Sequence, residues 1–183
     1  MDKAINIIKK NLPNIVNEAI ISEPEYASLL SGQLKFELGI PDAGSKIFNL
    51  INIWMSNMII DYKPPILTNS SIRSSFSAKL IRANFSDVLG TDDAYVNDTL
   101  RGYSLPWLEW LLLDGNAIVV PNYEVVMGSN PRSRTGSAVM KVSSGSWKVP
   151  DQFSGTISDN WITRAISNSQ DKIQNLLEKA LKT

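Results

Sequence analysis

The sequence contains no cysteine and no histidine among its 183 residues. The missing cysteine excludes disulfides and thiol nucleophiles, and the missing histidine removes imidazole bases and the commonest zinc ligand. Long hydrophobic runs are missing too, because the apolar stretches at 47–60 and 107–113 are interrupted by polar residues or too short to span a bilayer. The first residues, 1–4, lack the apolar stretch of a signal peptide. We therefore expect a cytoplasmic product without a membrane segment.

An excess of charge is also missing, because 18 basic and 18 acidic residues cancel. No overall positive field is then available to hold nucleic acid. The charges are nevertheless unevenly placed. Ser86 to Glu124 has seven acidic residues against one arginine, a net charge of minus six, whereas Val125 to Pro150 has four basic residues and no acid, plus four. Either the two stretches solvate different faces of one domain, or the acidic stretch of one subunit meets the basic stretch of the next in a head-to-tail ring.

Apolar residues recur at helical spacing over the first third of the chain. The spacing predicts helices at 3–21 and 25–38, and Pro13 is expected to kink or divide the first of them. A third helix is expected to begin at the cap residue Asp42 and to end at Lys63-Pro64-Pro65.

The rest of the chain changes its hydrophobic period. The pattern predicts a strand at 70–85, an irregular surface loop at 86–104, a short helix at 107–113, bent strands at 117–120 and 123–127, short strands at 138–142 and 147–149, and a closing helix capped by Ser158 or Asp159.

These elements predict a single domain, 1–183, of the α+β class. It consists of a helical N-terminal part at 1–65, a sheet with long loops at 66–157, and a C-terminal helix at 158–183. The expected architecture is a small, mainly antiparallel sheet flanked by N-terminal helices and a long C-terminal helix.

No motif for catalysis, phosphate binding or a dinucleotide is present. Asp87, Asp92, Asp93 and Asp98 lack the spacing of a calcium loop, which favours a solvated acidic loop. Glu109 is the only charge in an apolar helix and has no second carboxylate at a recognisable spacing, so a wet face or a paired structural role is favoured over a general acid. We predict no enzyme activity, no metal and no cofactor; the alternative is a hydrolase that binds a metal through carboxylates alone.

A loop at 129–137 has two arginines, Arg132 and Arg134, among small and polar residues. It has three interpretations: a phosphate-binding loop of a nucleic-acid-binding accessory protein, a mobile hairpin tip, or a basic arm that reaches a neighbouring subunit. The opposite sign of the preceding acidic stretch favours the third.

The second half of the chain resembles the tail-completion, or head-tail joining, proteins of long-tailed bacteriophages. The segments with this likeness are the apolar helix with an embedded glutamate, LPWLEWLLLDG at 105–115, the strand and proline-aromatic turn WKVPDQFSGT at 147–156, and the start of the closing helix, DNWITRA at 159–165.

The resemblance implies a non-enzymatic virion protein assembled in the cytoplasm of the infected host. It would form a ring, commonly sixfold, that joins the head connector to the tail tube in the phage neck, and DNA would pass through its lumen without sequence-specific binding. Tail terminator and stopper rings of the same neck are the alternatives. The implied partners are further copies of the chain and the neighbouring connector and tail-tube proteins, with no membrane.

The expected interface with neighbouring subunits or other partners includes aromatic, apolar and charged residues from the helix, the basic stretch and the turn: Trp107, Leu108, Glu109, Trp110, Arg132, Arg134, Lys141 and Phe153. The helix at 107–113 is apolar nearly all round, so we expect it to pack on more than one side. Either the whole helix packs in the core of its own subunit, or one side faces that core with Trp107 and the other side faces a neighbouring subunit with Leu108.

Overall fold

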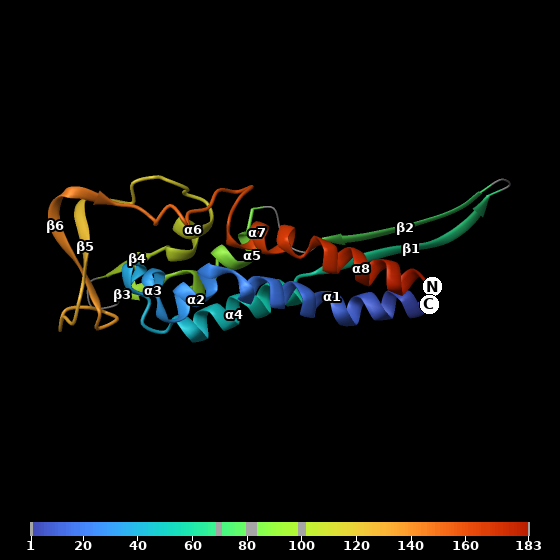
Figure 1. Ribbon diagram of the computed structural model, residues 1–183, viewed down its shortest axis with the longest axis horizontal. Helices are drawn as coiled ribbons and strands as arrows, with labels where there is room; N and C mark the ends of the chain where they lie inside the picture. Colours follow the sequence, from blue (N-terminus) through green and yellow to red (C-terminus); the bar gives the residue numbers. More distant parts are fainter. Residues whose placement is uncertain (1, 69–70, 80–83, 99–101, 183) are drawn as a thin grey trace.

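The structure is a computed structural model that describes residues 2–68, 71–79, 84–98 and 102–182 (Figure 1). Over these residues the chain is helical at both ends and forms three separate antiparallel ribbons of two strands between them. The helices are α1 Asp2–Ser22, α2 Pro24–Ser31, α3 Gln33–Leu38, α4 Ala43–Ser56, α5 Ser86–Leu89, α6 Trp107–Leu112, α7 Trp161–Asn168 and α8 Gln170–Leu181, with a 3-10 helix η1 at Asp92–Ala94. The strands are β1 Ile59–Thr68, β2 Ser71–Lys79, β3 Val96–Asp98, β4 Tyr103–Leu105, β5 Val120–Met127 and β6 Ala138–Trp147.

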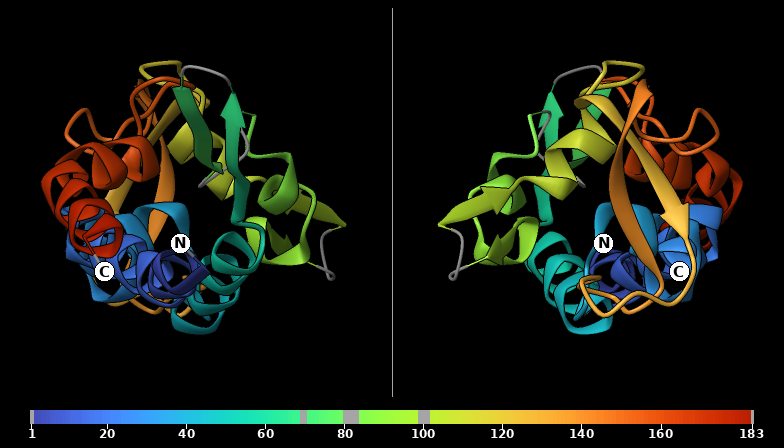
Figure 2. Two further views of the ribbon diagram at one scale, coloured as in Figure 1. Left: turned by 90° about the vertical axis from the view of Figure 1, so that its right-hand side faces the viewer. Right: turned by 90° about the vertical axis from the view of Figure 1, so that its left-hand side faces the viewer.

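The first and last helices lie side by side, so the two ends of the chain close one helical body (Figures 1 and 2). The α1 helix runs through Pro13 without division, whereas the sequence predicts a kink or a break there. At its end the carbonyl of Ile20 accepts a hydrogen bond of 3.0 Å from the Trp161 indole of α7. Trp161 also meets Trp54 of α4 edge to face, with the ring centres 6.0 Å apart. Helices from both ends of the chain therefore share one core.

Two of the predicted helices are divided by small polar turns. Gly32 separates α2 from α3, and the Ser28 hydroxyl there accepts a hydrogen bond from the backbone N–H of Leu34. Ser169 separates α7 from α8 in the same way. The N-terminal cap of α7 is Asn160, one residue beyond the predicted Asp159; its side chain accepts hydrogen bonds from two backbone N–H groups of the first turn.

The β1–β2 ribbon extends from the end of α4 past the ends of α1 and α8 (Figure 1). We call it the arm. The α4 helix ends at Ser56, before Lys63-Pro64-Pro65, so the prediction that these residues end a helix is wrong. Pro64 and Pro65 lie at the irregularity in the β1–β2 register between Lys63 and Ile66, and bulges of this kind are among the places where strands accommodate proline. Among the described elements, β1 and β2 pack extensively only on each other.

The predicted surface loop at 86–104 contains short elements instead: α5, η1, β3 and the start of β4. The predicted helix at 107–113 is confirmed as α6. The two bent strands predicted around Pro121 form one strand, β5, whose register on β6 shifts between Pro121 and Tyr123. Asn122 at this bulge has a left-handed φ of 60°.

The predicted α+β class is confirmed, with helices at both ends of the chain. The predicted sheet is a set of three ribbons rather than one sheet. At one end of the molecule the β5–β6 ribbon packs against α3, and at the other the arm leaves the body (Figure 1).

Candidate interaction site

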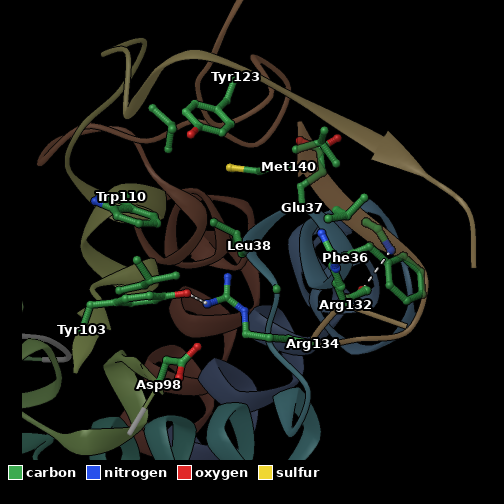
Figure 3. A pocket seen from close by; sticks show the side chains of 17 residues that line it. Phe36, Glu37, Leu38, Asp98, Tyr103, Trp110, Tyr123, Arg132, Arg134 and Met140 are labelled. Atoms are coloured by element: carbon green, nitrogen blue, oxygen red, sulfur yellow. Dashed lines mark hydrogen bonds between the residues drawn. The ribbon is translucent and has the colours of Figure 1, made fainter. Parts of the chain in front are cut away.

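A cleft opens between the β5–β6 ribbon and the elements α3, β4 and α6 (Figure 3). Its volume is about 520 Å³, a size typical of ligand or side-chain pockets. The wall is mainly aromatic and aliphatic, with Phe36, Leu38, Tyr103, Trp110, Tyr123 and Met140 among its residues. Four charged residues also line it: Glu37, Asp98, Arg132 and Arg134. Three predicted interface residues, Trp110, Arg132 and Arg134, therefore meet in one place.

Arg134 is held by its own subunit. Gly39, in the left-handed conformation with a φ of 66°, leaves room for the guanidinium, because a Cβ there would lie 2.8 Å from Nη2 of Arg134. Nη1 of Arg134 donates a long hydrogen bond of 3.4 Å to the hydroxyl of Tyr103 (Figure 3). The arginine predicted to reach a neighbour thus crosses the cleft within one chain.

Arg132 and Lys141 are exposed on the same ribbon. The backbone N–H of Arg132 donates to the side chain of Asn130, which shapes the turn and leaves the guanidinium at the cleft rim. Lys141 is the register partner of Glu124 across the ribbon. The acidic and basic stretches therefore meet partly within one subunit, which weakens the case for a purely electrostatic contact between subunits.

Trp110 lines the cleft and is held in place by contacts with Trp147, which is itself hydrogen-bonded to Glu37. It is half-buried and meets Trp147 of β6 edge to face, with ring centres 6.1 Å apart. The Trp147 indole donates a hydrogen bond of 2.8 Å to Glu37, whose other carboxylate oxygen accepts one of 2.6 Å from Gln33. Sequence reasoning misses Glu37 and Tyr103 because neither has a local signal; each joins the site through residues far away in the chain.

The remaining predicted interface residues lie elsewhere. Trp107 and Leu108 are fully buried, and Phe153 is 9% exposed. The Trp107 indole donates to the carbonyl of Asp93, which fixes α6 to η1. Side chains so buried have no surface to offer a neighbour, so Leu108 and Phe153 do not belong to an interface of the folded subunit. Glu109 is exposed on the wet face of α6.

An ion pair between a buried glutamate and a half-buried arginine joins α2 to α7. Glu25 is 1% exposed, and one of its oxygens lies 2.6 Å from Nη2 of Arg164, while Asp159 lies 2.9 Å from Nη1. Burial lowers the pKa of Arg164, but the hydrogen bonds with Glu25 and Asp159 outweigh it, so the pKa is raised overall. The second oxygen of Glu25 is buried and accepts no hydrogen bond from the described residues.

Metal-binding clusters and membrane-spanning helices are both absent from the described part of the chain. It contains no group of three or more acidic side chains placed to hold a metal ion. None of its helices is both long and apolar enough to cross a bilayer.

Comparison of the chain with protein families, with curated proteins and with solved structures gives no match.

Proposed function

We propose that the chain is a structural, non-enzymatic subunit that assembles with further copies of itself through the arm. The observation that carries this proposal is a ribbon of two strands that, among the described elements, packs extensively only on itself. At about 3.3 Å per residue, β1 extends over roughly 33 Å. A two-stranded ribbon without a supporting layer is marginal in water, and both its edges leave backbone groups unpaired. The arm is therefore suited to pack on a neighbour.

The phage neck is the assembly that we propose for this subunit. The support is the resemblance of 105–115, 147–156 and 159–165 to tail-completion proteins. The ring would join the head connector to the tail tube, with tail terminator or stopper as the alternative positions, and would be part of the virion after assembly in the host cytoplasm. The arm and the cleft lie at opposite ends of the subunit (Figure 1), an arrangement that gives it separate surfaces for a copy of itself and for a different neck protein.

The test of self-assembly is a variant with a shortened arm. Ile60 and Ala78 are register partners, so residues 61–77 are replaced by Asn-Gly, a dipeptide that favours a tight hairpin turn. The core helices contribute no residue to the excised part, so the melting temperature should stay close to that of the wild type. Sedimentation velocity should show oligomers for the wild type and monomers for the variant.

The matched control shortens the other ribbon. Val126 and Val139 are register partners, and replacing 127–138 by Asn-Gly removes the tip that has Arg132 and Arg134. This variant should still self-assemble. A wild-type chain that stays monomeric, or normal oligomers from the variant with the short arm, would overturn the proposal of assembly through the arm.

The neck position has its own test in purified virions. Antibody labelling or a reconstruction of the neck should place the chain as a ring at the head-tail junction. Density in the capsid shell or the baseplate, or absence of the chain from particles, would contradict the phage assignment and leave the self-assembly result standing.

A further inference from the structure

A groove without any charged residue runs between α1 and α4, on the helical body and apart from the cleft. Its volume is about 390 Å³. The apolar residues that it exposes most are Phe48, 64% exposed, and Ile21, 40% exposed. In a chain with 20% charged residues, a groove lined by nine uncharged residues is a distinct surface. Phe48 and Ile21 therefore give the groove an apolar wall that is open to solvent.

The groove also offers free amides. Asn14, Asn17 and Asn52 line it, and their side chains make no hydrogen bond within the described residues. An asparagine amide both donates and accepts, so three of them suit a backbone with unpaired N–H and C=O groups. The edge of a two-stranded ribbon is such a backbone. A helix as the occupant would have its backbone groups already paired.

The outer half of the arm matches the groove in chemistry. The sequence of its strands from Pro64 to Thr68 and from Ser71 to Ile72 has no charged residue; the charges of the strands lie at Asp61, Lys63, Arg73 and Lys79. The cleft at the other end of the molecule has four charged residues in its wall and so is a poorer match for this segment. A subunit cannot place its own arm in its own groove, because the arm points away from the body (Figure 1).

We infer that the uncharged outer part of the arm docks in the α1–α4 groove of a second copy of the chain. This inference rests on the proposed function and names the surface that receives the arm. Arm and groove are different surfaces, so the contact is heterologous and each copy both gives and receives an arm. Such contacts repeat from copy to copy and close into a ring when the rotation permits.

The first experiment places a charge in the groove. Phe48→Glu should weaken self-association at least about tenfold, because a carboxylate would lose its water on docking against a segment that has no charged residue. The matched control is Ile118→Glu, since Ile118 is 63% exposed and lies outside the groove. Both variants should melt near the wild type. Equal association of the two variants, each folded, would overturn the groove assignment.

The second experiment introduces cysteines. Because the chain has no native cysteine, no native thiol can form a competing disulfide. Thr68→Cys on one copy is mixed under mild oxidation with Asn14→Cys, Asn17→Cys or Asn52→Cys on another. Disulfides need Cα atoms within about 7 Å, so a docked arm should link to at least one groove position. Asn116→Cys, exposed and outside the groove, is the control. Yields at all groove positions no higher than the control yield would overturn the inference.

The two experiments also separate this inference from the proposed function. If the variant with the shortened arm fails to assemble while Phe48→Glu assembles normally, the arm is the contact and the groove is the wrong receptor. If the variant with the shortened arm assembles normally, the proposed function itself fails. Should Phe48→Glu prove unfolded, the disulfide yields decide the groove assignment alone.

Discussion

The Glu25–Arg164 pair joins a carboxylate that is 1% exposed to a guanidinium that is 29% exposed. Arg164→Ala would leave a carboxylate that is 1% exposed without its cation. Breaking one side of a buried pair costs about 3–5 kcal/mol, so the melting temperature should fall sharply. The control is Lys148→Ala, which removes a pair of the same 2.6 Å length whose side chains are 39% and 69% exposed. An exposed pair contributes only about 0.2–1 kcal/mol. Equal losses in chemical denaturation would contradict the role of burial.

Gly155 lies so close to neighbouring atoms that a side chain at this position would clash with them. A Cβ there would lie 2.7 Å from the carbonyl oxygen of Leu111 and 2.5 Å from Cβ of Asn160. Gly155→Ala should therefore destabilise the protein by roughly 1–3 kcal/mol through overpacking. At Gly90 the nearest atom to a Cβ is 3.7 Å away, so Gly90→Ala should be neutral or slightly stabilising. Thermal melts of the two variants measure the difference, and similar melts would show that the loop around Gly155 yields easily.

At the residue scale, the sequence identifies the types of side chain in the cleft better than it predicts which side chains are exposed to solvent. Three residues of the predicted interface, Trp110, Arg132 and Arg134, line one cleft, although the sequence does not predict that they meet. The prediction that Leu108 faces a neighbouring subunit is wrong, because Leu108 is fully buried. A helix that is apolar nearly all round has no polar face from which its orientation could be inferred. Glu37 and Tyr103 join the cleft only through tertiary contacts.

The α6 helix is the element whose prediction changes most with the structure. Both Trp107 and Leu108 are fully buried, so both alanine variants should lose stability: about 3–5 kcal/mol for the tryptophan and about 2–5 kcal/mol for the leucine. Glu109→Ala, on the exposed face, should shift stability by no more than about 0.5 kcal/mol. Denaturant midpoints measure these losses. A Leu108→Ala protein with wild-type stability and weaker self-association would restore the interface role for Leu108.

Element boundaries follow local signals where those signals are unambiguous. Pro106 and the apolar run after it mark the start of α6, and the alternation after residue 70 marks β2. The Pro64-Pro65 pair is ambiguous, because two prolines end a helix but also fit an irregular strand. Only the pairing of β1 with β2 decides between the two. The single breaks at Gly32 and Ser169 likewise depend on packing, since neither residue alone ends a helix.

At the scale of the whole molecule, α1 packs against α7 and α8, although these helices lie more than a hundred residues apart in the chain. The sequence predicts amphipathic helices at both ends but does not predict that they meet. The same reason explains why three ribbons replace one sheet: alternation identifies strands, whereas their partners depend on where the helices leave room. The arm lies outside this closed body, where its two strands pack extensively only on each other among the described elements (Figure 1).

Salt dependence distinguishes the two ways in which whole subunits could associate. A contact between the acidic and basic stretches of neighbours would weaken with salt, because the screening length falls from about 14 Å near 0.05 M to about 4 Å near 0.5 M. The docked part of the arm and its groove have no charged residue, so their association should hold or strengthen over this range. Sedimentation velocity on the wild type at both concentrations measures this.

The control is a double variant, Arg132→Glu with Lys141→Glu, which keeps the hydrogen bond from Arg134 to Tyr103. It should assemble like the wild type at low salt. Oligomers that dissociate at high salt, or that are lost in this variant, would show that charge and not the arm holds the subunits together.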